Sequence, residues 1–219
     1  HVSLVGSEMC IRDRDSIKNS EIRNIPLFDI KRLNHQLDHL DFENVIFQSK
    51  SSVDCFDHFK FISEKKIFAI GEGTALALKN KNISTLVPEK FGSKGLIDFI
   101  KRKKYGGNSL IIKGAKGLSI VRDELVNLGY KASEISCYER EKFISYSHLR
   151  ADYDGADVII FTSLFSAEIY FQELFTKNSR AIFLGISERI CSCADKFDVK
   201  INQIDYFSKN LVKDIRNII

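Results

Sequence analysis

The sequence predicts an α/β protein with two flavodoxin-like parallel-sheet lobes joined by a two-segment hinge, the first lobe being discontinuous in sequence. Three observations lead to this prediction: a pattern that occurs twice, an alternation of apolar runs with amphipathic stretches, and two extended segments between the copies. The chain has 219 residues, which is enough for two domains of about 100 residues each.

The repeated pattern is the most informative feature of the sequence. An apolar run ends in serine at 45–49, and a matching run ends in serine 114 residues later, at 159–163. Each run is followed by a helical pattern and then by a second apolar run that ends in glycine, at Gly71 and at Gly185. A repeat of this length is far longer than a solenoid unit, so it indicates the duplication of a whole domain.

Within each copy, buried apolar runs alternate with amphipathic stretches, which is typical of parallel strands covered by helices on both faces. In the first copy we expect strands at 45–48, 67–70, 84–87, 109–112 and 133–136, with helices at 51–63, 73–81, 93–104 and 116–128. In the second copy we expect strands at 157–161, 180–184 and 199–201, with helices at 164–175, 187–196 and 207–217.

The second copy lacks counterparts of the last two strands of the first copy and of the helix between them, and the N-terminus could supply these elements. We therefore expect lobe one at 15–28 plus 141–219, lobe two at 34–136, and interdomain linkers at 25–33 and 136–142. Pro26 disfavours a helix in the first linker. Two linkers that pass between the lobes are expected to form a hinge and to leave a cleft.

The first fourteen residues stand apart from the rest. The chain begins with His1, and residues 2–14 resemble a translated sequencing adapter. We expect residues 1–14 to be a non-native segment and leave them out of the fold prediction. The residues that remain before Pro26 are too few to supply all the missing counterparts.

Composition excludes several classes of protein. The net charge is only +4, and the densest basic run, 101–104, is typical of a solvated helix end rather than a nucleic-acid patch. No apolar run approaches the roughly 18 residues of a membrane span. Of five cysteines, Cys191 and Cys193 form a C-x-C motif without a second pair or nearby histidines, so we expect no metal site and reduced thiols in the cytoplasm.

Candidate binding residues follow from the predicted topology. Ligands of open parallel sheets bind beyond the carboxyl ends of the strands, where helix starts offer unpaired N–H groups to carboxylates or phosphates. The candidates at these ends are Ser49, Ser52, Gly71 and Thr74 in the first copy, Lys113 and Gly114 after a further strand, and Ser163, Ser166, Gly185 and Ser187 in the second copy. For any one of them an ordinary helix cap is the stronger interpretation, and only convergence on one cleft would favour binding.

Other motifs of small-molecule chemistry do not fit. Gly71-Glu72-Gly73 suggests a dinucleotide fingerprint, but Leu76 occupies the position of the third glycine. The sequence contains no phosphate-binding GxxxxGK[ST] loop, no GxSxG nucleophile motif and no HExxH zinc motif, and its histidines have no spacing suited to a metal or a triad.

In their order and spacing, the motifs resemble the uroporphyrinogen-III synthase family, from about residue 25 to the C-terminus. Two positions depart from the family pattern: Gln48 stands where threonine is common, and Ser187 with Glu188 stands in the second Gly-x-x-Thr site. The matching motifs are Phe47-Gln48-Ser49, Ala69-Ile70-Gly71-Glu72-Gly73-Thr74-Ala75, Ser93-Lys94-Gly95-Leu96, Lys113-Gly114, Cys137-Tyr138-Glu139-Arg140, Phe161-Thr162-Ser163 and Leu184-Gly185.

The resemblance implies a cofactor-free lyase of tetrapyrrole biosynthesis that acts as a monomer. Its substrate would be hydroxymethylbilane, a linear tetrapyrrole with eight carboxylates, which is closed to uroporphyrinogen III with inversion of the terminal ring. Such an enzyme mainly imposes a conformation on its substrate, and the candidate serines, glycines, Thr74 and Lys113 would contact carboxylates. Tyr138, in the second linker, would donate a hydrogen bond to the departing hydroxyl, although packing between the lobes is an equally open role.

Other functions remain open from the sequence. A non-catalytic, two-lobed α/β binding protein for a small anionic ligand would share the duplication and the hinge. A pair of flavodoxin-like or receiver domains is disfavoured because a receiver needs clustered acidic residues after its first strand, and a fragment without function is a third alternative. Resolving the product isomers formed from hydroxymethylbilane separates an enzyme from a binding protein.

Overall fold

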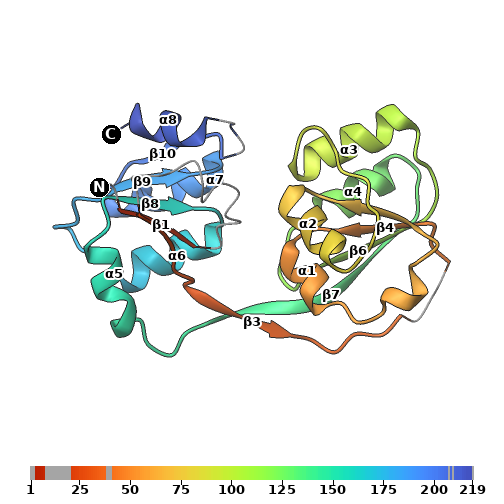
Figure 1. Ribbon diagram of the computed structural model, residues 1–219, viewed down its shortest axis with the longest axis horizontal. Coiled ribbons are helices and arrows are strands. Elements are labelled where there is room, and N and C mark those ends of the chain that lie inside the picture. The colour runs from red at the N-terminus through yellow and green to blue at the C-terminus, as the bar shows by residue number, and fades with distance from the viewer. Residues whose placement is uncertain (1–2, 8–20, 38–40, 207, 209, 219) are drawn as a thin grey trace. The chain divides into compact units, whose positions relative to one another are not determined.

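The computed structural model describes the chain except for residues 1–2, 8–20, 38–40, 207, 209 and 219 (Figure 1). The chain divides into two compact units, the first comprising His1–Asp29 and Lys142–Ile219 and the second comprising Ile30–Glu141. Each unit contains a five-stranded sheet accompanied by helices. The predicted fold class, α/β with two parallel-sheet lobes, is confirmed.

The sheet of the second unit contains β3 (Phe28–Arg32), β4 (Asn44–Phe47), β5 (Lys66–Ala69), β6 (Ser109–Gly114) and β7 (Ala132–Lys142). The strand order is β3-β7-β6-β4-β5, and β5, β4, β6 and β7 pair in parallel. Every residue of β4 and β6 is buried. Burial on both faces explains why these strands appear in the sequence as continuous apolar runs.

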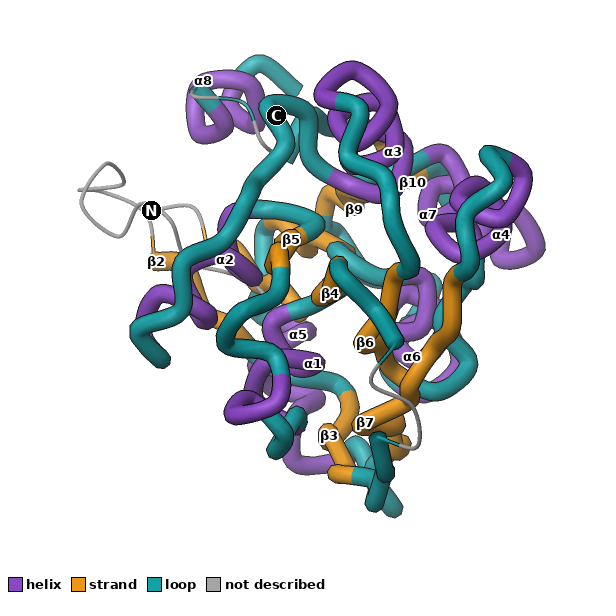
Figure 2. The backbone as a smooth tube through the Cα atoms, turned by 90° about the vertical axis from the view of Figure 1, so that its right-hand side faces the viewer, coloured by secondary structure: helices purple, strands orange, loops and turns teal. Residues whose placement is uncertain are grey.

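Helices cover both faces of this sheet (Figure 2). On β4, Val45 and Phe47 face one side and pack with α1 and α2, whereas Ile46 faces the other side and packs with α3 and α4. The period of two along a strand distributes these apolar side chains between two separate cores. The helices are α1 (Lys50–Cys55), α2 (Glu72–Asn80), α3 (Gly92–Lys103) and α4 (Ile120–Asn127), with a 3-10 turn η1 (Phe59–Phe61).

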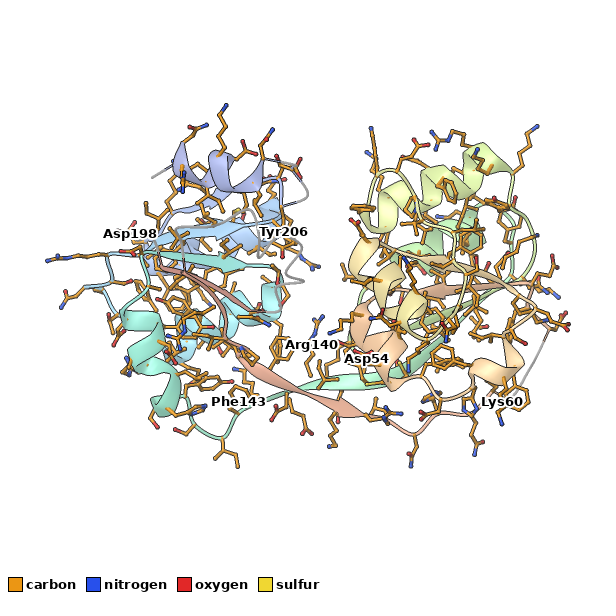
Figure 3. All side chains as sticks on the ribbon, in the orientation of Figure 1. Asp54, Lys60, Arg140, Phe143, Asp198 and Tyr206 are labelled. Carbon is orange, nitrogen blue, oxygen red and sulfur yellow. The ribbon has the colours of Figure 1, made fainter. Side chains whose placement is uncertain are left out.

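The sheet of the first unit contains β1 (Ser3–Ser7), β2 (Glu21–Asn24), β8 (Val158–Phe161), β9 (Ile182–Gly185) and β10 (Ile201–Gln203). The strand order is β10-β9-β8-β1-β2, and all neighbouring pairs are parallel. Side chains fill the interior of each unit (Figure 3). The helical segments of the first unit are η2 (Ser147–Leu149), α5 (Arg150–Asp154), α6 (Leu164–Glu173), α7 (Glu188–Cys191), η3 (Ser192–Phe197) and α8 (Leu211–Arg216).

The N-terminal segment differs from our expectation. The sequence prediction leaves residues 1–14 out of the fold, but Ser3–Ser7 forms β1 between β8 and β2, with Val5 in register with Ile159. In this sheet β1 and β2 hold the positions that β6 and β7 hold in the other sheet, so the N-terminus supplies both missing strands. A counterpart of α4 would fall at 8–20, outside the described residues.

Several elements end earlier than predicted, and tertiary packing explains the main difference. The helix expected at 51–63 stops at Cys55, because Phe56 is extended and buries its ring against Phe47 and Phe59. The strand expected at 84–87 is a single bridge from Leu86 to Phe68, and Pro88 follows soon after. The helix expected at 187–196 divides into α7 and η3, and α5 was not predicted.

The two predicted linkers, 25–33 and 136–142, are largely extended. They contain β3 and the second half of β7, which are neighbours in one sheet, and Leu33 N donates to Cys137 O at 2.9 Å. In the part of the chain that the structure describes, no helix is long and apolar enough to cross a bilayer.

Candidate functional site

The carboxyl ends of the strands in the second unit lie at one edge of the sheet, because Phe47 is in register with both Ala69 and Ile112. Ser49 and Gly71 lie in the turns that follow β4 and β5, and Gly114 is the last residue of β6, just before the turn at residues 115–119. We call these segments the strand-end turns. The topology therefore gathers the candidate residues of the first copy along one edge, as ligand sites of parallel sheets require.

The turn after β4 is a closed capping box. Ser52 N donates to Ser49 Oγ at 3.0 Å, and Ser49 N donates to Ser52 Oγ at 3.1 Å. Ser49 is partly exposed, whereas Ser52 is completely buried. The Ser52 hydroxyl completes the cap and presents no surface to a ligand in this structure.

Ser49 also contacts the predicted catalytic tyrosine. Its Oγ lies 3.0 Å from the Tyr138 hydroxyl, and either oxygen could be the donor. Tyr138 is only 4% exposed. Since a serine hydroxyl has one hydrogen and two lone pairs, Ser49 can accept from Ser52 N and still bond to the phenol. The Ser49 turn thus fixes the position of the Tyr138 hydroxyl.

A β-bulge turns Tyr138 toward Ser49. Along β6 and β7, Lys113 is in register with Ser136 but Gly114 is in register with Tyr138, so Cys137 is an extra residue. Regular alternation would place Cys137 and Tyr138 on opposite faces, yet both pack in the core cluster of α1 and α2. Bulges of this kind often redirect a side chain next to an active site.

Gly114 makes room for the ring of Tyr138. A Cβ atom at Gly114 would lie 2.6 Å from Tyr138 Cζ and 2.9 Å from its hydroxyl oxygen. The ring therefore packs directly against the backbone of Gly114, an approach that only glycine permits. Ala115 N completes the contact by donating to Tyr138 O at 2.7 Å.

Lys113 has a different role from the one we predicted. Its side chain is buried, and Nζ lies 3.1 Å from Glu134 Oε1, 3.1 Å from Ser119 Oγ and 3.2 Å from Leu118 O. These three acceptors match the three hydrogens of an ammonium group. The donors of Lys113 are therefore satisfied inside the protein.

The turn after β5 is more open. Gly71 is the N-cap of α2 and its backbone is extended, a conformation that any residue adopts; an added Cβ would meet Phe91 at an ordinary 3.6 Å. Gly71 O accepts from Ala75 N at 3.0 Å, and Thr74 in the first turn is 5% exposed. Gly71 is accessible to a ligand, whereas burial leaves Thr74 almost no contact surface.

The first unit repeats the construction of the Ser49 turn. Ser163 caps α6 by accepting from Ser166 N at 3.2 Å, and the two hydroxyls are also hydrogen-bonded to each other. Ser166 is completely buried, so its hydroxyl, like that of Ser52, presents no surface to a ligand. Ser163 itself is partly exposed.

Gly185 is the last residue of β9, and Ser187 follows it. Both lie at the same edge as Ser163, since Phe161 and Gly185 are in register. A Cβ at Gly185 would approach Cys191 Sγ and Ile190 Cγ2 to 3.0 Å, so a close contact with α7 requires this glycine. Ser187 is partly exposed and makes no capping hydrogen bond through its side chain. Its hydroxyl is therefore better placed for a ligand than the buried serines are.

Two hollows of the second unit lie away from the strand-end turns. One of about 590 Å³ is bordered by residues 34–36 with Asp57 and His58, and one of about 830 Å³ includes Lys65, Lys66 and Lys81 on its border. Neither is lined by a predicted site residue. Among the described residues, no group of three or more His, Cys, Asp or Glu side chains could hold a metal ion.

Three features of the site were not predicted from the sequence: the bulge at Cys137, the acceptor Glu134 and the turn residue Ser119. The Lys113-Gly114 motif marked the correct turn, but no sequence signal indicated that Lys113 points into the protein.

Comparison with known proteins identifies the family. Residues 21–205 match the family described as "Uroporphyrinogen-III synthase HemD". The fold is similar to a uroporphyrinogen-III synthetase from Helicobacter pylori, with a TM-score of 0.68, 14% identity, and coverage of 100% of this chain and 99% of that chain. It is also similar to a mutant uroporphyrinogen III synthase from Thermus thermophilus, with a TM-score of 0.56, 12% identity, and coverage of 100% of this chain and 97% of that chain. The structural matches support the fold. Because the sequence match covers most of the chain, this chain belongs to the uroporphyrinogen-III synthase family.

Proposed function

We propose how the residues of this chain carry out the reaction of its family, the cyclisation of hydroxymethylbilane to uroporphyrinogen III in tetrapyrrole biosynthesis. The strand-end turns bind the carboxylates of the substrate, and Tyr138 assists the departure of its hydroxyl. The observation that carries this proposal is the hydrogen bond between Ser49 and Tyr138 beside Gly114, at the carboxyl edge of the sheet.

The substrate carboxylates bind to the turns that keep some accessible surface. In the second unit these contain Ser49 and Gly71, and in the first unit Ser163 and Ser187, whereas Gly114 is buried and makes room for Tyr138. Backbone N–H groups at such turns attract anions, and each exposed contact contributes about 0.3–1 kcal/mol. A substrate with many carboxylates gains from several such weak contacts at once.

The chemistry starts with the loss of the hydroxymethyl oxygen as water. The remaining methylene carbon shares its positive charge with the pyrrole nitrogen. The terminal ring attacks this carbon through its substituted position to form a spiro intermediate, which fragments and recombines with that ring inverted. The ring carbon that closes the macrocycle then loses its proton, which balances the proton taken up by the departing hydroxyl. We propose that Tyr138 donates a hydrogen bond to the departing oxygen and that Ser49 orients the phenol.

Replacement of Tyr138 with phenylalanine tests the catalytic role. We expect ring closure to slow by at least about 10-fold, because the donor is lost while the ring still fills its place beside Gly114. Tyr130→Phe, in the same unit, is the matched control. Product isomers formed from freshly made hydroxymethylbilane give the readout, and unchanged turnover of the Tyr138 variant would rule out the role.

The same assay tests the function itself. Uroporphyrinogen III must form faster than the symmetric isomer that closes without an enzyme. Formation of the symmetric isomer alone would indicate a non-catalytic protein that binds a small anionic ligand. We further propose that the protein works as a monomer in the cytoplasm, without a cofactor or a nucleic-acid partner, and sedimentation of the purified chain tests the monomer.

A further inference from the structure

We propose that Lys113 and Glu134 form a positioning pair: they hold the turn at residues 115–119 in one conformation, so that Leu118 meets an apolar part of the substrate at the carboxyl edge of the sheet. This inference rests on the proposed function, because it assigns a pyrrole ring to a named side chain. Lys113 and Glu134 do not touch the substrate and act through the turn.

Lys113 is buried and Glu134 is largely covered, in a place where apolar residues would suffice. The side chains of Lys113 and Glu134 are 6% and 16% exposed, and their charged atoms are 3.1 Å apart. Lys113 continues the apolar run Leu110, Ile111 and Ile112 of β6, all of which are buried. Because apolar residues of similar volume can replace many buried ion pairs without loss of stability, a role beyond stability is worth testing here.

The contacts of the pair lead to the turn. Lys113 Nζ donates to Leu118 O at 3.2 Å and to Ser119 Oγ at 3.1 Å, and Ser119 Oγ in turn donates to Glu134 Oε2 at 2.9 Å. Ser119 is the N-cap residue of α4, yet its side chain makes no capping hydrogen bond. Its hydroxyl is directed to the ion pair instead, so the pair and the end of the turn form one network.

The start of the turn is tied to Tyr138. Ala115 N donates to Tyr138 O at 2.7 Å, and Gly117 N donates to Gly114 O at 3.1 Å. Lys116 between them is left-handed, with φ at 61°. The turn is thus hydrogen-bonded to the strands at both ends. A displacement of Leu118 and Ser119 at its C-terminal end would therefore also displace the residues around Tyr138.

The fixed turn exposes an apolar side chain. Leu118 is 53% exposed, although its carbonyl oxygen is held by a buried lysine. Leu118 lies on the turn that follows β6 at the carboxyl edge of the sheet, and an exposed leucine there suits the apolar face of a pyrrole ring better than a carboxylate, because transfer of apolar surface from water favours contact. The turn would therefore recognise the ring system of the substrate, while other turns bind its carboxylates.

The decisive experiment replaces both charges. Lys113→Met alone leaves the largely covered Glu134, among the described residues, with only the longer ion pair to Arg122, whose Nη1 is 3.5 Å from Glu134 Oε2, so we expect a lower melting temperature. Lys113→Met with Glu134→Met should melt within a few degrees of the native protein, yet raise KM for hydroxymethylbilane at least about 10-fold and speed amide exchange at 116–119, while β6 stays protected. Lys103→Met, at the exposed end of α3, is the control. Native KM and native exchange in the double variant would overturn the proposal.

Two further variants keep the test decisive if the double variant does not fold. Ser119→Ala preserves the ion pair and cuts its link to the turn, so exchange at 116–119 should rise. Leu118→Ala should raise KM several-fold without a change in kcat, whereas Leu128→Ala, at the far end of α4, should not. Native behaviour of both variants would refute the inference. Amide exchange needs no activity, so failure of the native protein to form uroporphyrinogen III would refute the proposed function separately.

Discussion

Gly114 and the ring of Tyr138 occupy neighbouring space at the end of β6, and this packing gives a sharp test at the scale of single residues. We expect Gly114→Ala to displace the ring, because the new Cβ would lie 2.6 Å from Cζ. Overpacking of this kind destabilises a protein by about 1–3 kcal/mol. The displaced phenol should also lose Ser49, so ring closure should slow at least as much as in Tyr138→Phe.

Gly71→Ala is the matched control for that substitution. Its new Cβ would meet Phe91 at an ordinary 3.6 Å, and its backbone is extended. Its free energy of unfolding should change by less than about 1 kcal/mol. Urea titration of both variants measures the difference, and equal stability of the two would contradict the packing of Tyr138 on Gly114.

Because the thiol of Cys137, the extra residue of the bulge, is buried, we expect the stability of the protein to depend on pH. Burial raises the pKa of its thiol to about 12 from an ordinary value of 9.0. Because the folded state disfavours the thiolate, the stabilising contribution is complete below about pH 9 and is lost as the pH rises toward 12. We expect the Cys137→Ala variant to show a weaker loss of stability over this range than the native protein.

Alkylation gives a second readout of the same thiol. At pH 8, iodoacetamide should leave Cys137 unmodified in the folded protein and react with it after denaturation in urea. Cys191, which is partly exposed, provides an internal comparison in the same sample. Rapid modification of Cys137 in the folded state would contradict its burial.

At the scale of elements, the buried serines of the two capping turns should affect stability and not affinity. Ser52→Ala removes the bond that closes the α1 cap and should cost about 1 kcal/mol. Ser166→Ala in α6 should behave alike, because both serines are completely buried. KM for hydroxymethylbilane should stay at its native value, and a marked rise in KM at native stability would restore the original prediction of substrate contact.

The sequence predicts the order and type of most elements because their signals are local. Apolar runs such as 45–48 and 109–112 indicate buried strands. In the stretch after each run, apolar residues recur with the periodicity of an amphipathic helix. The early end of α1 was not predictable in this way, since the packing of Phe56 against Phe47 and Phe59 depends on residues that meet only in the fold.

Site residues are predicted less well than elements, for a related reason. Ser49 and Ser52 look equally suitable in the sequence, and only burial separates a ligand contact from a cap. Lys113 looks like a free cation until Glu134, on the neighbouring strand, appears beside it. A bulge is a shift of one residue between two strands, so the orientation of Tyr138 is a property of the pair β6 and β7 and not of either sequence alone.

At the scale of the whole molecule, the duplication extends to the residues around Tyr138. The strand registers make Asn24 of the first unit equivalent to Glu134 of the second, because Asn24 is aligned through Gly6 with Ile160, and Glu134 through Ile111 with Ile46. Phe28 lies four residues after Asn24, and Tyr138 lies four residues after Glu134, so Phe28 corresponds to Tyr138. Each unit buries an aromatic ring at this place, but only the second unit supplies a hydroxyl there.

This difference predicts that the catalytic role belongs to one unit. Phe28 packs in the core of the first unit, with its ring 5.2 Å from that of Phe165. We expect Phe28→Tyr to leave the rate of ring closure unchanged in the native background and not to rescue Tyr138→Phe. The added hydroxyl should lower stability by about 1–3 kcal/mol if it finds no partner, because burial of an unsatisfied polar group is costly. Rescue of the Tyr138→Phe rate by Phe28→Tyr would show that the two duplicated positions are interchangeable. The assignment of the hydrogen-bond donor to the second unit alone would then be wrong.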